Sequence, residues 1–398
     1  MVKYTKRVQF EPVRNPERFQ YDPAFIERGI REVLGRIRKI IPDFVHQYPS
    51  AASEGLVYSR QDNTGDWVNG FWTGMLWLSY ELSGDALFRA VAEAQYDDYE
   101  LRLQNNLGLA HHDIGFLYIP SILAQYKLTG SPKAKQLCLK AADRLAGRFS
   151  ERAGIIQVRD SDTQGVFIVD CCMNIPLLFW AAKETGERSY YLKALSHISQ
   201  VCSYMIREDA STFQRYKIDE VTGQPCFGSQ GQGYNDDSCW SRGQAWAIYG
   251  LALAYRYTQE PEFLAMAQRL AHYFLNRLPQ DDICCWDLIF TGDNDPRDSS
   301  AAPIAACGLL EIEGSLSQEN PLRRVYHNAA AAMLMNLTDG YLTPANLSNG
   351  LLMHGVYCKK DRPGKEGSGH GDDECCIWGD YFYLEGLRRM QREWNPYW

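Results

Sequence analysis

The feature that most constrains the fold of this chain is an internal repeat of paired helical segments with a period of about 50 residues. In each pair one segment is apolar on nearly all sides, as over residues 71–80 and 175–182, while the other is amphipathic, as over 134–149. A helix that is apolar all round has to be buried, whereas an amphipathic helix turns one face to water. The repeat therefore predicts buried inner helices, each covered by an outer helix.

Helical periodicity dominates the chain, and strand patterns are few and short. Tight turns such as Thr129-Gly130-Ser131 and Thr185-Gly186-Glu187 join neighbouring segments, and the glycine in each can end a helix in the left-handed conformation. Each such turn closes one helical hairpin. The predicted helices span residues 23–45, 68–83, 85–105, 113–128, 132–149, 170–185, 188–207, 241–258, 260–277, 300–314, 320–337 and 376–391.

Six inner helices surrounded by six outer helices form an (α/α)6 toroid, an all-α fold of six helical hairpins, and an open α-solenoid is the alternative. The long loops favour the toroid. They cover residues 46–67, 150–169, 208–240, 278–299 and 338–375. Because each of them leads into the N-terminus of an inner helix, we expect them to meet at one end of the ring and to build a cavity there. Loops of this length in a compact domain are usually functional.

Length and composition limit the class of protein. A length of 398 residues suggests two or three domains, but a closed repeat favours a single catalytic domain over 1–398 with a short extension over 1–21. The net charge of −8 and the absence of a basic stripe argue against a nucleic-acid partner. No run of 18 apolar residues occurs and residues 1–15 lack a signal-peptide core, so we expect no membrane segment and a cytoplasmic location. The sequence leaves the oligomeric state open.

The twelve cysteines favour a reducing compartment as well. Six of them form the adjacent pairs Cys171-Cys172, Cys284-Cys285 and Cys375-Cys376. Adjacent cysteines match neither C-x-x-C zinc ligands nor a secreted disulfide framework. His111 and His112 have no third ligand at a usual spacing, so we predict that the chain holds no metal.

Two aspartates, Asp113 and Asp170, stand where two equivalent inner helices are predicted to begin. Carboxylates at equivalent ends of equivalent helices can face one cavity, which is the arrangement that acid/base chemistry on a sugar requires. Aspartate is also a favoured helix N-cap, so capping alone is the alternative for each of them. The aromatic surroundings favour the first interpretation, because a flat ring can stack on the C–H face of a sugar.

Every predicted inner helix carries polar or aromatic residues at this same end, which a purely structural ring would not need. Arg242, beside two tryptophans, can clamp a carboxylate or a sulfate with its planar guanidinium. Asp298 and Asp380 can cap helices or pair with Arg297 and its neighbours. The chain has no glycine-rich phosphate loop before a strand and no G-x-S-x-G turn, which disfavours nucleotide binding and serine hydrolysis.

These residues together resemble the unsaturated glucuronyl hydrolases of glycoside hydrolase family 88, from about residue 26 to residue 383. The matching runs are Asp66-Trp67, Gly70 to Gly74, His111 to Phe116, Asp170 with Met173 to Leu177, Gln232-Gly233, Trp240 to Trp246, Arg297 to Ala301, Ala306 to Glu311 and Ile377 to Tyr381. Each run is weak by itself, but all of them in order at matching spacing are specific. The resemblance implies the (α/α)6 fold and activity on oligosaccharides left by polysaccharide lyases, which carry a 4,5-unsaturated uronic acid at the non-reducing end.

The resemblance also implies a role for each matched site residue. Asp170 would be the general acid and base, with Asp113 as its essential partner, and the C4=C5 vinyl ether would be protonated without a metal or an organic cofactor. The residues implied to bind the unsaturated sugar are Trp67, His112, Gln232, Arg242 and Trp246. The implied partner is an unsaturated oligosaccharide, and a glycosaminoglycan fragment is the first interpretation.

Four positions depart from the family pattern. Arg159 stands where a tryptophan is usual, Gln214 and Gly231 stand where histidines are common, and Cys358 follows Tyr357 where another histidine is common. We expect these changes to affect the sugar beyond the scissile bond, with Arg159, Gln214 and Tyr357 among the residues that bind substrate. A cation in place of a stacking ring indicates a more anionic, for example sulfated, neighbouring sugar.

Three alternatives stay open on the sequence. An unsaturated rhamnogalacturonyl hydrolase would share the fold and the chemistry but act on pectin fragments. A sugar 2-epimerase on the same toroid needs histidine bases, and the chain has only eight histidines. A non-enzymatic helical scaffold would leave the polar groups at one end of the ring unexplained.

Overall fold

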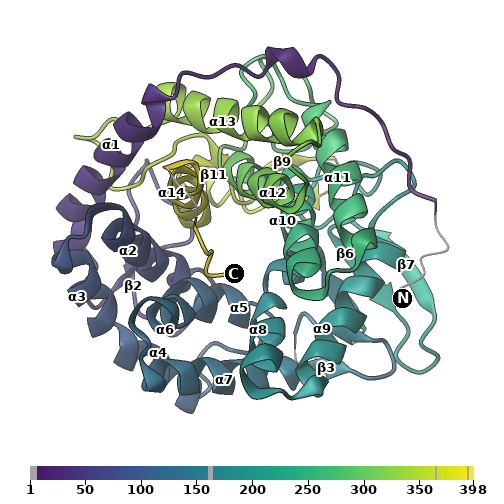
Figure 1. The fold of residues 1–398 in the computed structure, drawn as a ribbon, viewed down its shortest axis with the longest axis horizontal. Coiled ribbons are helices and arrows are strands. Elements are labelled where there is room, and N and C mark those ends of the chain that lie inside the picture. Colours follow the sequence, from purple (N-terminus) through teal and green to yellow (C-terminus); the bar gives the residue numbers. More distant parts are fainter. Residues whose placement is uncertain (1–6, 160–164, 364, 392–393) are drawn as a thin grey trace.

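The computed structural model describes residues 7–159, 165–363, 365–391 and 394–398, and its helices form a ring of two concentric layers (Figure 1). The inner layer consists of α2 (Asn69–Ser83), α5 (Ile114–Tyr118), α6 (Ala124–Thr129), α8 (Pro176–Thr185), α10 (Ser241–Thr258), α12 (Ala301–Ser315) and α14 (Ile377–Gln391). The outer layer consists of α1 (Ala24–Ile40), α3 (Ala86–Ala94), α4 (Tyr96–Gln104), α7 (Pro132–Ala146), α9 (Arg188–Gln200), α11 (Pro261–Leu275) and α13 (Leu322–Gly340). Helix α14 packs against both α12 and α2, which closes the ring. The predicted (α/α)6 toroid is confirmed, and the open solenoid is excluded.

The two layers differ in burial in the way that their sequences predict. Every residue of α12 from Ala301 to Ile312 is buried, because this helix is apolar on nearly all sides. In α7 the buried residues recur every three or four positions from Ala134 to Leu145, so its other face meets water. Burial of one large apolar side chain contributes about 1.5–3 kcal/mol. The inner layer therefore forms the core that holds the ring together.

Two of the predicted helices are each split into two α-helices. The segment 113–128 is split into α5 and α6 by a π-helical turn, Ile119–Leu123, because Pro120 has no N–H to continue the α-helical ladder. The segment 85–105 is split into α3 and α4 at Gln95, whose buried side-chain amide donates to two backbone carbonyls of the segment before α2.

The long loops contain short antiparallel strands that helical periodicity did not indicate. These are β1 (Tyr48–Pro49), β2 (Arg60–Gln61), β3 (Phe149–Ser150), β4 (Ile155–Ile156), β5 (Val166–Ile168), β6 (Arg215–Ile218), β7 (Pro225–Ser229), β8 (Gly355–Val356), β9 (Asp361–Arg362), β10 (Lys365–Glu366) and β11 (Asp372–Glu374). Strands β5, β6 and β7 form one sheet that joins the loop 150–169 to the loop 208–240. The Val169 amide donates to the Gln214 carbonyl at 2.9 Å, so this pairing extends to the residue before Asp170.

Two further findings concern the whole chain. Across the described residues, no helix combines the length and the apolar character that a membrane crossing requires. Near the start of the chain, Arg18 donates to Asp282 in the loop 278–299 at 3.0 Å, which holds this segment against the ring. The assignment of 1–398 to one catalytic domain with an extension over 1–21 stays a prediction.

Candidate active site

Asp113 and Asp170 stand at the same end of two neighbouring inner helices. Asp113 directly precedes α5, and Asp170 lies in a 3-10 turn, Val169–Met173, that leads into α8. The predicted helix 170–185 therefore begins as a tighter turn and becomes α-helical only at Pro176. The Asp113 side chain makes no helix-capping hydrogen bond. Capping alone therefore does not account for this aspartate.

A glycine and an asparagine bring the two helix starts together. A Cβ atom at Gly115 would collide with the backbone of Asn174, so only glycine permits this approach. The Asn174 side-chain amide donates to Asp113 Oδ1 at 3.2 Å and to the Asp170 carbonyl at 3.4 Å, and its oxygen accepts from the Phe116 amide at 2.9 Å. Asn174 thereby links both helix starts and orients the Asp113 carboxylate.

The two carboxyl groups differ in their electrostatic environment. Burial, and after it the negative charge of Asp113, raise the pKa of Asp170 to about 7, although Arg242 and Arg215 oppose the shift. Asp170 Oδ1 is buried and has no hydrogen-bond partner among the described residues. Burial also raises the pKa of Asp113, and the hydrogen bond from the Asn174 amide opposes this shift by stabilising the charged form. Asp170 can therefore hold a proton near neutral pH, while the hydrogen bond from Asn174 favours the ionised form of Asp113.

Two histidines flank Asp113 and are neutral at pH 7. Burial lowers the pKa of His111 to about 4, and burial together with the charges of Arg148 and Arg159 lowers the pKa of His112 to about 3. His111 Nδ1 accepts from the Asp113 amide at 3.1 Å, and His112 Nε2 lies 3.5 Å from Asp113 Oδ1. No group of three or more metal-ligating side chains occurs in the described part of the chain. The absence of a metal from the reaction stays a prediction.

A hydrogen-bonded chain connects four of the residues predicted to bind the sugar. Trp67 Nε1 donates to the Tyr357 hydroxyl at 3.1 Å, and the Gln232 amide donates to the Tyr357 carbonyl at 2.7 Å. The Gln214 amide donates to Gln232 Oε1 at 2.8 Å. The Trp67 ring also stacks on Trp378, with ring centroids 5.3 Å apart. The structure thus brings together side chains from loops that are distant in sequence.

Arg242 is buried between two aromatic rings and already has a carboxylate partner. Its guanidinium carbon lies 4.4 Å from the ring centre of Trp240 and 4.8 Å from that of Trp378. It donates to Asp298 at 3.1 Å and to the Tyr357 carbonyl at 3.1 Å. Of the two roles that the sequence left open for Asp298, the pairing with Arg297 is not found, because Asp298 pairs with Arg242. The capping role is met in part, since Asp298 Oδ1 accepts from the amide of Ser300, directly before α12, at 3.0 Å. A sugar carboxylate would have to share this guanidinium with Asp298.

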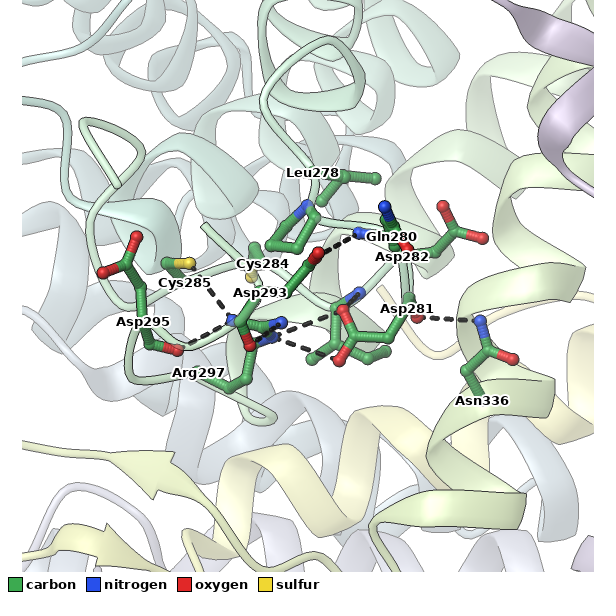
Figure 2. A network of polar contacts seen from close by, with 12 residues as sticks. Leu278, Gln280, Asp281, Asp282, Cys284, Cys285, Asp293, Asp295, Arg297 and Asn336 are labelled. Carbon is green, nitrogen blue, oxygen red and sulfur yellow. Dashed lines mark hydrogen bonds and ion pairs between the residues drawn. The ribbon is translucent and has the colours of Figure 1, made fainter. Parts of the chain in front are cut away.

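Arg297 instead holds the loop 278–299 in shape (Figure 2). Its guanidinium donates to Asp281 Oδ2 at 3.1 Å and to the backbone carbonyls of Gly292, Asp293 and Asp295. The Tyr341 hydroxyl donates to the same Asp281 carboxylate at 2.6 Å. The loop that delivers Asp298 to the site is thus fixed from within.

Asp380 plays a comparable role for another loop. Its carboxylate accepts from the Tyr58 hydroxyl at 2.9 Å and from the amides of Leu351 and Leu352 at 3.0 and 2.9 Å. Burial raises its pKa to about 7, and these three bonds oppose the shift. Asp380 therefore joins the loop 46–67 to the loop 338–375, neither as a cap nor as a partner of Arg297.

Trp246 and Arg159 differ sharply in exposure. Trp246 is fully buried, its ring lies 5.0 Å from that of Phe116, and its Nε1 has no partner among the described residues. Arg159 is exposed, and its backbone pairs with His111, which precedes Asp113 by two residues. The sugar contacts predicted for both residues stay predictions.

A comparison with known proteins identifies the family. The model of Glycosyl Hydrolase Family 88 matches residues 36–371. The chain belongs to Glycosyl Hydrolase Family 88. It is 41% identical to an unsaturated chondroitin disaccharide hydrolase of Streptococcus pyogenes serotype M1 over all of both chains. It is 38% identical to an unsaturated glucuronyl hydrolase of Bacillus sp. (strain GL1), with 94% of this chain and 98% of the relative covered.

Solved structures agree with this family 88 assignment. The crystal structure of unsaturated glucuronyl hydrolase from Streptococcus agalactiae matches with a TM-score of 0.94 and 38% identity over all of both chains. A variant of that enzyme complexed with dGlcA-GalNAc6S matches with a TM-score of 0.87 and 38% identity over 99% of both chains. The resemblance that the motifs indicated is therefore confirmed.

Two arginines of this family 88 member, Arg215 and Arg362, were not among the site residues predicted from the sequence. A Cβ atom at Gly231 would lie 2.7 Å from the Arg215 guanidinium carbon, and the Arg362 guanidinium donates to the Gly231 carbonyl. The glycine, at a position where a histidine is common, thus leaves the space that the Arg215 guanidinium occupies. A basic residue directly after Gln214 was the available signal, but nothing in the sequence pairs it with position 231.

Proposed function

We propose that this family 88 hydrolase removes a 4,5-unsaturated uronic acid from the non-reducing end of glycosaminoglycan oligosaccharides that polysaccharide lyases have produced. Relatives that match over nearly the whole chain carry the names unsaturated chondroitin disaccharide hydrolase and unsaturated glucuronyl hydrolase. The observation that carries the proposal is the pair of aspartates, because burial and the charge of Asp113 raise the pKa of Asp170 to about 7, so that Asp170 can keep a proton near neutral pH.

The reaction starts with proton transfer from Asp170 to C4 of the unsaturated sugar. The C4=C5 electron pair forms the new C–H bond and leaves an oxocarbenium-like centre at C5, next to the ring oxygen. Water then adds to C5, and the ionised Asp170 takes the proton that this water loses. The resulting hemiketal opens and releases the remaining sugar, so one water is consumed and Asp170 returns to its protonated form. No metal or organic cofactor takes part in these reaction steps.

The surrounding side chains orient the unsaturated sugar in this proposal. Trp67 offers a ring that Trp378 supports from one side, and Gln232 and Tyr357 hold each other in place. Arg242 supplies positive charge near the acidic ring, although Asp298 neutralises part of that charge. We assign Arg242 to binding of the sugar carboxylate through the N–H groups that Asp298 and the carbonyls of Val356 and Tyr357 leave free.

We assign the second sugar to the basic side of the site. Arg159, Arg215 and Arg362 come from three different loops, and Arg215 and Arg362 meet at Gly231. A sulfate or carboxylate on the second sugar would be attracted by these charges, and the S. agalactiae variant was crystallised with a sulfated disaccharide. We also place the enzyme in a reducing cytoplasm, because none of its twelve cysteines, which all lie in the described part of the chain, forms a disulfide, and most of them are buried.

A panel of unsaturated disaccharides tests the proposal. Chondroitin and hyaluronan disaccharides, with and without sulfate, and an unsaturated rhamnogalacturonan disaccharide are each incubated with the enzyme. Loss of the vinyl-ether absorbance reports hydrolysis of the C4=C5 system. The proposal predicts turnover of glycosaminoglycan disaccharides, whereas turnover of the pectin-derived disaccharide alone would assign the enzyme to that alternative substrate.

A further inference from the structure

Residues 394–398 turn inward and end at the centre of the ring, where Figure 1 marks the letter C. Trp398 is only 1% exposed there. Its indole stacks on Phe382 of α14, with ring centroids 5.6 Å apart and planes 19° apart, and it meets Phe116 of α5 edge-on at 6.0 Å. The centre of the ring next to Phe116, here called the bore, is thus filled by the side chain of Trp398, which is far from Phe116 in sequence.

Polar contacts hold this segment in the bore. Trp398 Nε1 donates to Glu385 Oε2 at 2.7 Å, and Lys127 Nζ donates to the backbone carbonyls of Pro396 and Tyr397 at 3.0 and 2.7 Å. Glu385 is completely buried and also accepts from Arg389 at 3.0 Å. A buried carboxylate is costly unless it is fully hydrogen-bonded, so the bond from the indole N–H to Glu385 fixes the position of the Trp398 ring.

Phe116 connects Trp398 to Asp113, one of the two proposed catalytic aspartates. Its ring lies 5.4 Å from that of Trp67 and 5.0 Å from that of Trp246. Its amide donates to Asn174, which in turn donates to Asp113. The side of Phe116 that faces the bore therefore rests on Trp398, and its backbone belongs to the bonded group that orients Asp113.

The helix that carries Phe116 has little rigidity of its own. Helix α5 is five residues long, and a π-helical turn follows it directly. Short helices depend on tertiary packing rather than on their own hydrogen bonds. The position of α5 is consequently set by what packs against it, and Trp398 supplies that support from within the bore.

We propose that Trp398 is a positioning residue for catalysis, which acts through Phe116 and Asn174 to hold Asp113 against Asp170. This inference rests on the proposed roles of the two aspartates. If the support is lost, α5 can shift toward the bore, and Asp113 then raises the pKa of Asp170 less. Turnover should fall, and the basic limb of the kcat profile should move to lower pH.

The test compares Trp398→Ala and Trp398→Phe with wild type and with Trp180→Ala. Trp180 is a buried indole of α8 that packs on Tyr126, so its loss matches the stability cost but leaves Phe116 untouched. We expect Trp398→Ala to lower kcat by at least about tenfold, since small misplacements of catalytic groups are costly, and to shift the basic limb. Trp398→Phe should recover most of the activity, and Trp180→Ala should keep the wild-type pH profile.

Hydrogen exchange of the Phe116 amide gives a readout that does not depend on activity. Exchange should be faster in Trp398→Ala and return toward the wild-type rate in Trp398→Phe. If the wild type hydrolyses no unsaturated disaccharide, the proposed function fails, and the exchange rates then test only whether Trp398 holds Phe116 and α5 in place. If Trp398→Ala does not fold, Trp398→Leu takes its place. Wild-type kcat, pH profile and Phe116 exchange in a folded Ala or Leu variant would overturn the inference.

Discussion

Asn174 donates its side-chain amide to Asp113 Oδ1 at 3.2 Å, while its own oxygen accepts from the amide of Phe116. This contact orients one carboxylate and favours its ionised form. Its neighbour Asp170 has no such partner at Oδ1 and is the group whose pKa is raised to about 7. The two aspartates at equivalent helix starts thereby differ in environment, because a hydrogen bond favours the ionised form of Asp113, whereas burial and the charge of Asp113 favour the protonated form of Asp170.

Asp170→Asn should remove nearly all turnover while the fold stays intact. The amide keeps the shape of the side chain but cannot deliver a proton to C4, and a general acid or base is typically worth about 10²–10⁴-fold. The measurement is kcat on an unsaturated disaccharide together with a thermal melt. Near-wild-type turnover in a normally folded variant would remove Asp170 from the mechanism.

The same substitution should stabilise the protein above neutral pH. The folded-state pKa of Asp170 lies above its ordinary value of 3.8, so the contribution of Asp170 to wild-type stability falls as pH rises from 3.8 to about 7. Asp170→Asn has no proton to lose there, and its advantage should grow over this window to as much as about 4 kcal/mol. Urea unfolding of both proteins at pH 5 and pH 8 measures the difference. An advantage that does not increase with pH would show that the pKa of Asp170 is not raised.

Arg242→Ala should impair both stability and binding. It leaves Asp298 buried without its partner, and loss of one member of a buried ion pair costs about 3–5 kcal/mol. At a temperature where the variant is folded, KM for the acidic sugar should rise more than kcat falls, because a clamp on a carboxylate acts largely in the ground state. In the unfolding experiment, Arg242→Ala/Asp298→Ala should lose less than the sum of the two single variants. Additive losses would contradict the pairing.

Arg159→Trp should change the preference for the second sugar by only a few-fold. Arg159 is exposed, and a solvated charge contact contributes about 0.2–1 kcal/mol. We expect the ratio of kcat/KM for sulfated over unsulfated disaccharides to fall, with no change in the pH optimum. Arg215→Trp is the comparison at a second arginine of the proposed site for this sugar. A ratio that stays constant in Arg159→Trp would place this residue outside the site.

Much of the fold could be predicted because the inner helices are apolar on nearly all sides. Such helices can lie only in the buried inner layer of a ring, and the glycine-containing turns mark where the chain reverses within each hairpin. The interruption at Pro120 has a local cause that can be recognised in sequence. The interruption at Gln95 depends on carbonyl groups of a distant segment, so it could not be predicted.

The candidate site likewise contains residues that could be predicted from the sequence and contacts that could not. Asp113 and Asp170 could be found because each stands at a helix start within a repeat. The pairing of Arg242 with Asp298 joins residues that lie 56 positions apart, and the sequence equally allowed Arg297 as the partner of Asp298. Contacts made across the ring, such as that of Trp398 with Phe116, have no signal in local periodicity.

The pH dependence of kcat in wild type and in Asp113→Asn tests the coupling of the two aspartates most directly. Turnover needs a protonated Asp170, so activity should decline as pH rises through the pKa of that group. Asp113→Asn removes the negative charge that helps to raise this pKa, so kcat should fall and the basic limb should move to lower pH. A basic limb at the same pH in both proteins would contradict the account, because it would show that Asp113 does not hold the proton on Asp170.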